Sequence, residues 1–283
     1  MRGIGLIPNW KKENAALVVE RIGDFFKRRN ILLLTADPRQ TDYQAAGSLA
    51  ERLESWRGRV ELLIVAGGDG TILRAARDLA HWDVPILGIN MGHKGFLAEI
   101  EVEQMDRYLQ YIVAGQYQFR ERMMLEAAVQ REGRLLGRFI ALNDIVVSRG
   151  PFSRILTVNT YINNEFLECY SGDGVIVATP TGSTGYSLSA GGPIVNPSLE
   201  LIVITPICPH SLNNRAVIVA VNEQILMRVD SRQAQVVMTA DGQVGFALED
   251  GDEIAVRKAE QKVKLVHFGD NSFYRLLREK IKS

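Results

Sequence analysis

The sequence predicts an α/β domain followed by an all-β domain, because its hydrophobic pattern changes near residue 120. Before that point, apolar runs of strand length alternate with amphipathic helical stretches, which indicates a parallel sheet covered by helices on both faces. After it, short β-rich runs broken by Gly, Asn, Asp and Pro follow one another, which is typical of a sandwich-like unit. A chain of 283 residues is long enough for two ordinary domains.

The first part of the chain reads as a Rossmann-like α/β domain. We expect strands at 2–8, 30–35, 61–68 and 84–90. We expect helices at 15–29, around 46–56, at 71–81 and at 105–113. Each helix is inferred from apolar residues that recur with the helical period, as Val18, Ile22 and Phe25 do in the first.

The second part is expected to be a β-sandwich-like domain. The strand candidates are 124–130, 139–148, 155–163, 174–180, 199–206, 216–221, 224–230, 235–240 and 262–268. The chain ends in SFYRLLREKIKS, which we interpret as a helix capped by Ser272 with cations near its C-terminus.

Composition excludes several classes of protein. Hydrophobic residues make up 46% and charged residues 23%, which is typical of a folded globular chain, and the 33 basic residues balance the 33 acidic ones. We therefore expect no nucleic-acid or membrane partner, and any anionic ligand must be held by a local site. Cys169 and Cys208 form no CxxC, and no histidine pair has metal-ligand spacing, so neither a disulfide nor a zinc site is expected and the cytoplasm is the expected location.

A glycine-rich turn follows the third expected strand. It reads Gly67-Gly68-Asp69-Gly70-Thr71 and lies at the sheet edge where ligands of α/β proteins bind. The backbone amides of such a turn suit phosphate, although Asp69 would repel it. The alternative is that Asp69 only bonds to its own turn. The P-loop motif and the G-x-G-x-x-G fingerprint are both missing from the sequence.

The most unusual stretch is GDGVIVATPTGSTGYSLSAGGPIV, residues 172–195. Its Thr and Ser hydroxyls and glycine amides, grouped around Tyr186, suit a ribose, a pyrophosphate or an amide-bearing ring. The alternative is a flexible polar loop, but a mere connection between two strands would be shorter.

Three weaker signals accompany this stretch. Asn143 and Asp144 precede an apolar strand and could bind a base and a ribose, although a hairpin turn is the plainer interpretation. The DGQ at 241–243 resembles a hairpin tip. Phe96, in the loop after the fourth strand, could stack on a base or anchor that loop in the core.

Taken together, these motifs resemble those of the NAD kinases over nearly the whole chain. The matching motifs are GGDGT, NMGHKGFL, ND, the long 172–195 stretch, TPICPHSL and DGQ. The resemblance implies a homodimer or homotetramer with NAD bound between two domains. It also implies that residues 1–118 and 268–283 form the α/β domain, with the C-terminal helix packing back on it, and that 119–267 form the all-β domain.

The resemblance also implies roles for individual residues. Asp69 would accept the proton of the adenosine ribose hydroxyl, or share a Mg²⁺ with ATP, and Gly70 would contact the sugar through its backbone. Asn143 and Asp144 would bind adenine and ribose, and Asp173 the nicotinamide carboxamide. The remaining expected NAD contacts are Phe96, Arg154, Thr184, Gly185, Tyr186, Ser187, Leu188, Ser189 and Gln243. Asp144 stands where many relatives have Glu, and Gly185 where Ala is usual.

The resulting hypothesis is an enzyme that transfers the γ-phosphoryl group of ATP to the 2′-hydroxyl of NAD, with Mg²⁺. A divalent ion between Asp69 and the ATP phosphates would remove their repulsion, since its attraction to a carboxylate at ~4 Å is worth several kcal/mol. Two alternatives stay open from the residues alone. One is a kinase of a lipid or sugar hydroxyl, and the other is an NAD sensor without catalysis.

Overall fold

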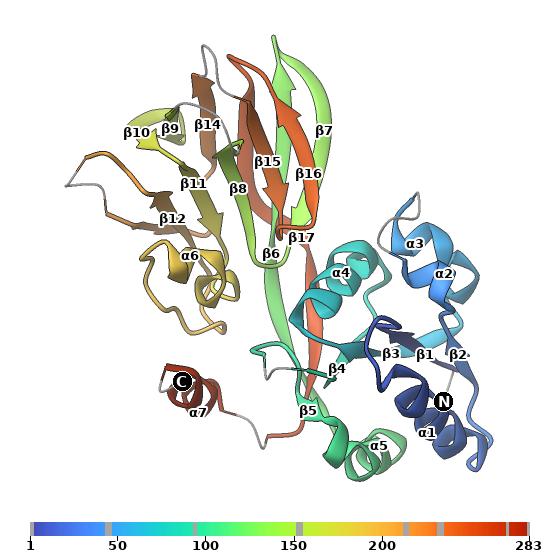
Figure 1. The fold of residues 1–283 in the computed structure, drawn as a ribbon. Helices are drawn as coiled ribbons and strands as arrows, with labels where there is room; N and C mark the ends of the chain where they lie inside the picture. The colour runs from blue at the N-terminus through green and yellow to red at the C-terminus, as the bar shows by residue number, and fades with distance from the viewer. Residues whose placement is uncertain are drawn as a thin grey trace. The chain divides into compact units, whose positions relative to one another are not determined.

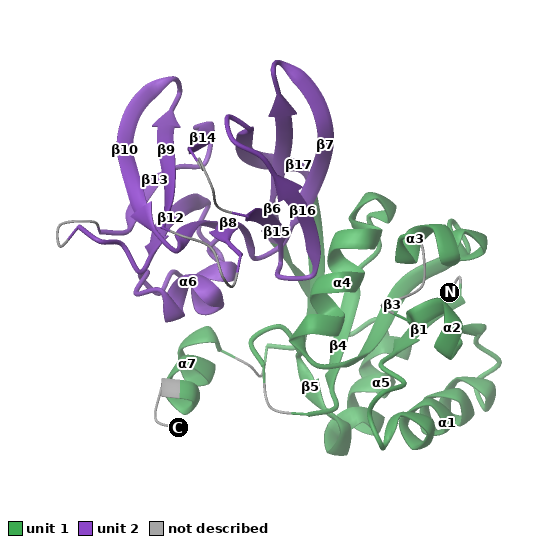
Figure 2. Cartoon of the chain, turned by 45° about the horizontal axis from the view of Figure 1, so that its top comes forward, with its two compact units in different colours: residues 1–121, 262–283 green, residues 122–261 purple. Residues whose placement is uncertain are grey.

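The computed structural model describes residues 3–42, 47–92, 95–150, 155–211, 215–230, 235–269 and 272–281 (Figure 1). The chain divides into two compact units, coloured separately in Figure 2. Unit 1 comprises residues 1–121 and 262–283, and unit 2 comprises residues 122–261. Two strands, β6 (Gln118–Arg131) and β17 (Glu253–His267), carry residues in both units.

Unit 1 contains the predicted parallel sheet. Its strands are β1 (Gly3–Pro8), β2 (Leu33–Thr35), β3 (Val60–Gly67), β4 (Ile86–Asn90) and β5 (Ile100–Glu101). They run in the order β2-β1-β3-β4, and β5 and the end of β17 both pair with β4 in parallel. The helices of this unit are α1 (Ala15–Lys27), α2 (Pro38–Thr41), α3 (Leu49–Arg52), α4 (Asp69–Leu79), α5 (Met105–Val113) and α7 (Phe273–Ile281).

Burial on both faces explains the continuous apolar strands of unit 1. β3 is buried at every position except Glu61. One face of the sheet shares a core with α1 and α5, whose Val18, Phe26 and Leu109 are fully buried. The other face carries α4, whose Ile72 lies directly over Gly88 of β4. Figure 1 shows the two layers of helices, so the predicted architecture is confirmed.

The C-terminal helix packs against unit 1, as predicted. The ring of Phe273 in α7 lies with its centroid 6.4 Å from that of Phe96. The helix expected around 46–56 is wrong in its extent, because α3 ends at Arg52 and a separate 3₁₀ turn covers Glu54–Trp56. Ser48 starts α3 with a capping box to Glu51, which is a strong helix start signal.

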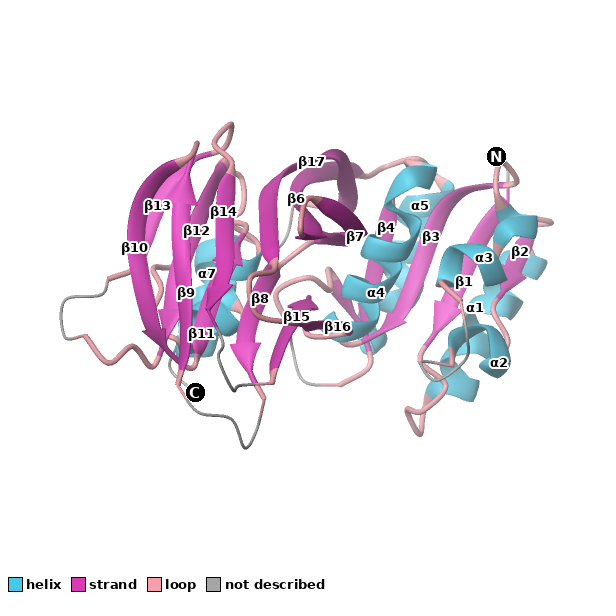
Figure 3. Cartoon of the chain, turned by 90° about the horizontal axis from the view of Figure 1, so that it is seen from above, coloured by secondary structure: helices cyan, strands magenta, loops and turns pink. Residues whose placement is uncertain are grey.

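Unit 2 is a sandwich of two antiparallel layers, shown mostly as strands in Figure 3. One layer contains β6, β7 (Arg134–Ala141), β9 (Leu156–Ile162), β10 (Glu165–Gly172), β14 (Ile225–Asp230) and β17. The other runs β13 (Val217–Ala220), β12 (Leu201–Ile207), β11 (Gly174–Ala178), β8 (Asp144–Arg149), β15 (Val236–Ala240) and β16 (Val244–Leu248). Apolar side chains from both layers form one core that includes Leu125, Val147, Val177 and Met227.

One buried ion pair fastens β6 to the turn before β17. Asp252 is fully buried, and its two carboxylate oxygens accept hydrogen bonds from Arg131 Nε at 2.7 Å and Arg131 Nη2 at 2.9 Å. Burial alone would raise the pKa of Asp252, but the Arg131 contact and the Glu249 amide outweigh it and hold the pKa below its ordinary value.

The helices in the described part of the chain include none with the length and apolar character of a membrane span.

We expect Arg131→Met to destabilise unit 2 strongly, because it leaves a buried charge without its partner. The expected loss of unfolding free energy is about 3–5 kcal/mol, measured as a shift in thermal unfolding. Arg228→Met removes a more exposed pair with Glu253, in which 51% of the arginine side chain is exposed, and should cost at most about 1 kcal/mol. Equal shifts for the two variants would contradict this interpretation.

Candidate functional site

The predicted glycine-rich turn joins β3 to α4 at the carboxyl edge of the parallel sheet. β3 ends at Gly67, Gly68 is the N-cap and α4 begins at Asp69. The N-cap has no side chain to satisfy the first amides of the helix. An acid in the first turn also interacts favourably with the helix dipole. The turn therefore combines the N-terminal end of a helix with one carboxylate in its first turn.

The Asp69 carboxylate is oriented by a different loop from its own. Its Oδ2 accepts a hydrogen bond from the amide of Phe96 at 2.8 Å, and its Oδ1 accepts one from the amide of Leu97 at 3.2 Å. Gly95 lies so close to this carboxylate that a Cβ at Gly95 would collide with it. The recorded hydrogen bonds of the carboxylate thus run to segment 95–97, which the short-range interpretation of the turn did not foresee.

Two other predicted site residues lie beside Asp69, Gly70 in the chain and Phe96 through its amide hydrogen bond. Gly70 is exposed at the start of α4. Phe96 is half-buried, and Lys280 of α7 places its Nζ 5.1 Å from the centre of the Phe96 ring. The Phe96 ring therefore contacts α7 and is not part of the buried core.

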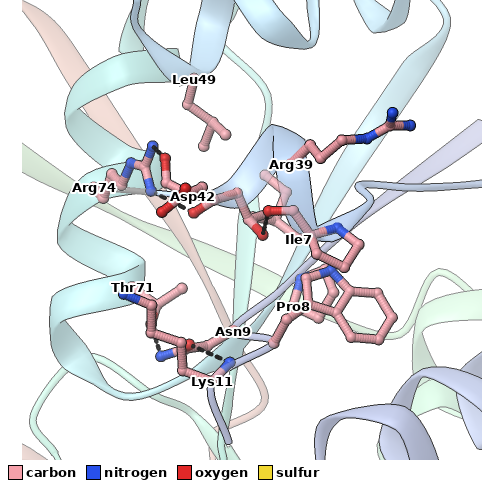
Figure 4. A pocket seen from close by; sticks show the side chains of 12 residues that line it. Ile7, Pro8, Asn9, Lys11, Arg39, Asp42, Leu49, Thr71 and Arg74 are labelled. Carbon is pink, nitrogen blue, oxygen red and sulfur yellow. Dashed lines mark hydrogen bonds between the residues drawn. The ribbon is translucent and has the colours of Figure 1, made fainter. Parts of the chain in front are cut away.

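A cavity of about 430 Å³ opens beside the same turn within unit 1. It lies where β1 and β2 end, and its lining includes Lys11, Arg39, Thr71 and Arg74 (Figure 4). Arg74 is buried and donates to the carbonyl oxygens of Thr41 at 2.7 Å and Asp42 at 3.0 Å, so it fixes the cavity wall. Arg39, by contrast, is almost fully exposed. Sequence reasoning missed this cavity, although a lysine pair follows β1 directly.

In unit 2, Asp241 organises the backbone around the predicted Asn-Asp pair. Its carboxylate accepts hydrogen bonds from the amides of Leu142 at 3.0 Å, Asn143 at 2.7 Å and Asp144 at 3.2 Å. DGQ forms the predicted hairpin tip between β15 and β16, and Asp241 adopts a left-handed φ of 52° there. The plainer hairpin interpretation of Asn143-Asp144 is wrong, because β8 pairs with β11 and β15 and not with the preceding β7.

Asn143 and Asp144 both carry polar groups with unmet hydrogen-bonding capacity. Asn143 Oδ1 is buried and has no partner among the described residues. The Asp144 side chain is also buried, and burial, followed by repulsion from Asp241, raises its pKa to about 7. A Cβ at Gly185 would lie 3.4 Å from Asn143 Nδ2 and 3.8 Å from Asp144 Oδ2. Gly185 therefore lies next to both side chains, at a position where an added Cβ would make ordinary van der Waals contacts with them.

The hydroxyl-rich segment, residues 179–195, is ordered by its own side chains. Thr179 Oγ1 donates to the Leu142 carbonyl at 2.6 Å and accepts from the Gly182 amide at 3.0 Å. Ser183 Oγ donates to the Pro180 carbonyl at 2.7 Å and accepts from the Val195 amide at 3.0 Å. A Cβ at Gly182 would collide with the backbone of Asn143. The segment is thus a built structure, with a 3₁₀ turn over Gly182–Thr184 and helix α6 over Tyr186–Ser189.

The predicted residues of this segment face different surroundings. Ser187 is fully buried, and its Oγ lies 2.9 Å from Thr205 Oγ1, so it anchors α6 to β12. Thr184 Oγ1 donates to the Thr181 carbonyl at 3.2 Å. Tyr186 is 47% exposed. The segment also places Leu188 half-buried and Ser189 exposed.

Asp173 forms an ion pair that sequence reasoning missed. Arg149 Nε donates to its Oδ1 at 2.6 Å, across the paired strands β8 and β11. Register places Asp144 opposite Ala178 and Ser148 opposite Gly174, and Asp173 lies one residue further along, so the Asp144 and Asp173 ends of this pair are about 16–17 Å apart. Burial, then Cys208, Asp173 and Asp144, raise the pKa of Tyr186, which places its hydroxyl within electrostatic reach of both ends.

Two predicted NAD contacts remain, Gln243 and Arg154. Gln243 is half-buried in the tip between β15 and β16. Arg154 lies outside the described residues. The described part of the chain contains no group of three or more His, Cys, Asp or Glu side chains that could hold a metal ion.

Comparison with known protein families gives two adjoining matches. The family model for the ATP-NAD kinase N-terminal domain matches residues 4–117, and that for the ATP-NAD kinase C-terminal domain matches residues 142–268. The chain is 47% identical to an NAD kinase of Natranaerobius thermophilus, covering 99% of this chain and 98% of the relative. It is 44% identical to an NAD kinase of Moorella thermoacetica, covering 100% of this chain and 90% of the relative.

Solved structures show the same fold. Yeast NADH kinase complexed with NADH aligns with a TM-score of 0.80 and 25% identity, over 100% of this chain and 88% of that one. An NAD kinase from Archaeoglobus fulgidus in complex with ATP aligns with a TM-score of 0.75 and 26% identity, over 99% of this chain and 98% of that one.

We expect Asp144→Asn to stabilise the protein at pH 8 and to have little effect near pH 4. The pKa of Asp144 rises from an ordinary 3.8 to about 7 on folding, so the folded chain holds an extra proton between these values. Stability therefore falls as pH rises through that window, and the variant avoids the loss, which is on the order of 1–4 kcal/mol. Thermal unfolding across this pH range measures the difference. The exposed Asp250→Asn is the control, and a matching pH dependence in both variants would contradict the argument.

Proposed function

We propose where the substrates bind in this chain, which belongs to the ATP-NAD kinase family and catalyses the ATP-dependent phosphorylation of NAD. Both family models and the close relatives support this activity over nearly the full chain. They do not favour a lipid or sugar kinase, or a sensor without catalysis. The sites proposed below rest on the geometry of each unit taken separately.

The observation that carries the proposed NAD site is the unmet hydrogen-bonding capacity beside Gly185. Asn143 Oδ1 is buried without a partner, and Asp144 is a buried carboxyl next to it. Burying such groups costs free energy unless a partner completes them. Adenosine offers the required donors, because the amino group of adenine suits the amide oxygen and the ribose hydroxyls suit the carboxylate. We assign the adenosine half of NAD to these two residues.

The nicotinamide half is assigned to the opposite end of the β8–β11 pair. Arg149 occupies Asp173 Oδ1 and thereby fixes the carboxylate, while Oδ2 can accept from a carboxamide N–H. The distance of about 16–17 Å between the two ends suits the two halves of one extended dinucleotide. Tyr186 and Ser189 are exposed on α6, and we assign them to the surface that lines the dinucleotide between these two ends. Ser187 supports this surface from the inside.

Asp69 is the proposed catalytic residue. Each of its oxygens accepts one amide hydrogen bond, which leaves further lone pairs on both oxygens for a substrate hydroxyl. The amides hold the carboxylate in one orientation, so no reorganisation is needed when it takes the proton of the 2′-hydroxyl. Gly70 has no side chain to obstruct the approach of the sugar.

The cavity beside the turn is the proposed site for ATP. It adjoins Thr71 at the start of α4, where backbone amides and the helix dipole favour phosphate. Lys11 and Arg39 add positive charge at its mouth. Attack on the γ-phosphoryl group requires mainly positioning and charge stabilisation, which these groups provide.

We propose Mg²⁺ as a cofactor that is held jointly by a protein carboxylate, water and the phosphates of ATP. The described residues offer no three-ligand cluster, which fits Mg²⁺ because this ion commonly takes one or two protein carboxylates and otherwise water and substrate phosphates. Asp69 is the carboxylate that would share it. When bound with ATP, the ion would neutralise charge on the phosphates.

We expect wild-type protein to form NADP from NAD, ATP and Mg²⁺, and Asp69→Asn to lose about 10²–10⁴ in kcat. An amide can keep one of the two hydrogen bonds to segment 95–97 but cannot accept the proton. Product is read with an NADP-specific dehydrogenase. Asp83→Asn, which removes an exposed acid of the same unit, is the control. Wild-type turnover in Asp69→Asn would contradict the catalytic role.

We expect Lys11→Ala and Arg39→Ala each to raise KM for ATP about 3- to 10-fold, because each removes one charge from the proposed phosphate site. KM for NAD should stay within about twofold. The control is Arg57→Ala, which removes an exposed arginine that pairs with Glu54 at the surface. Unchanged KM values for ATP in both variants would place the donor elsewhere.

A further inference from the structure

Three side chains from distant parts of unit 1 form what we call the Glu99 network. Glu99 Oε1 lies 3.0 Å from His267 Nδ1 and accepts the amide of Phe268 at 3.1 Å. On its other side, His267 Nε2 contacts the guanidinium of Arg120. Glu99 and His267 are mostly buried, with 14% and 8% of their side chains exposed. None of the three side chains is assigned a role by the mechanism above.

His267 lies between the other two side chains of the network. Its Nε2 contacts the Arg120 guanidinium, and its Nδ1 lies 3.0 Å from Glu99 Oε1. The imidazole ring therefore links Arg120 to the Glu99 carboxyl group. This arrangement holds the carboxylate from one side while the Phe268 amide holds it from the other.

Glu99 belongs to the segment that orients Asp69. Leu97, whose amide donates to Asp69, is only two residues away and is itself buried. The Glu99 amide donates to the Gly88 carbonyl of β4 at 3.1 Å, and Ile100 continues the segment as β5. Segment 95–99 is thus held at one end by Asp69 and at the other by β4 and the Glu99 network.

Glu99 occupies a buried position that is energetically unfavourable for a carboxylate. Burial raises the pKa of Glu99, although the Phe268 amide, His267 and Arg120 all oppose that rise. A carboxylate kept in such a place costs free energy that a neutral side chain would not. A neutral side chain would fill the same space at a lower cost in free energy. We therefore take the hydrogen bonds of Glu99 to be the reason for a carboxyl group at this position.

We propose that Glu99 is a positioning residue for the phosphoryl transfer, acting through the amides of Phe96 and Leu97 to set the orientation of the Asp69 carboxylate. The proposal rests on the catalytic role proposed for Asp69. His267 and Arg120 act by holding Glu99. The described hydrogen bonds of the Glu99 side chain run to His267 and Phe268, so its proposed effect on Asp69 is transmitted through segment 95–97.

The first test is Glu99→Ala, assayed for NADP formation at a temperature where circular dichroism shows the variant folded. We expect kcat to fall about 10- to 100-fold, the range for a catalytic group displaced by about 1 Å. KM for NAD and for ATP should stay within about threefold. Glu99→Gln keeps an oxygen at the same place and should recover part of kcat. The control is Lys264→Met. Lys264 lies on β17, as His267 does, and pairs with Asp83, so its substitution should leave kcat unchanged.

The second test is a double-mutant cycle. If Glu99 acts through Asp69, Glu99→Ala should reduce the residual rate of Asp69→Asn by less than about twofold, because the two effects are not additive. A full 10- to 100-fold loss in that background would overturn the proposal, and so would wild-type kcat in Glu99→Ala. Loss of stability alone, with kcat unchanged in both Glu99 variants, would show a merely structural role.

A third readout does not depend on activity. The amide resonances of Phe96 and Leu97 report their hydrogen bonds to Asp69, and heteronuclear NMR of the full chain should show both shifting in Glu99→Ala but not in Lys264→Met. Unchanged resonances would overturn the proposed coupling even in an active enzyme. If wild-type protein forms no NADP, the proposed function fails, whereas the resonance comparison still decides whether Glu99 positions segment 95–97.

Discussion

The hydrogen bonds between the Asp69 carboxylate and the amides of Phe96 and Leu97 are the interaction on which the proposed chemistry depends. They join two loops that follow neighbouring parallel strands, β3 and β4. A carboxylate on a flexible turn would need to be ordered in every catalytic cycle, at a cost in conformational entropy. Here the fold orders it in advance. Gly95 permits the approach because any larger residue would collide with the carboxylate.

The same device appears in unit 2 with a different purpose. Asp241 accepts three amides from residues 142–144 and so fixes the backbone that carries Asn143 and Asp144. Asp241 is itself buried, and its charge contributes to the raised pKa of Asp144. One acid therefore organises a loop, while the neighbouring acid, Asp144, is the one that we propose binds a ligand. Asp69 is itself ordered by backbone amides and is also the residue that we propose acts on the substrate.

Patterns that are local in sequence predicted much of this structure. The parallel strands of unit 1 and helix α5 follow from burial and periodicity within single segments, and the turn around Asp69 was recognisable from its glycines. The start of α3 at Leu49 was missed because the helical pattern was extended back to Ala46, through the capping box at Ser48 that marks a helix N-terminus. Contacts over long distances in the chain could not be predicted. His267 and Glu99 are 168 residues apart, and Arg149 meets Asp173 only because β8 and β11 pair.

A crystal structure of the full chain with NAD bound tests the central claim most directly. The account predicts that Asp69 keeps its two amide hydrogen bonds and places a carboxylate oxygen about 2.6–3.2 Å from the 2′-oxygen of the adenosine ribose. A carboxylate turned away from the sugar would contradict the account.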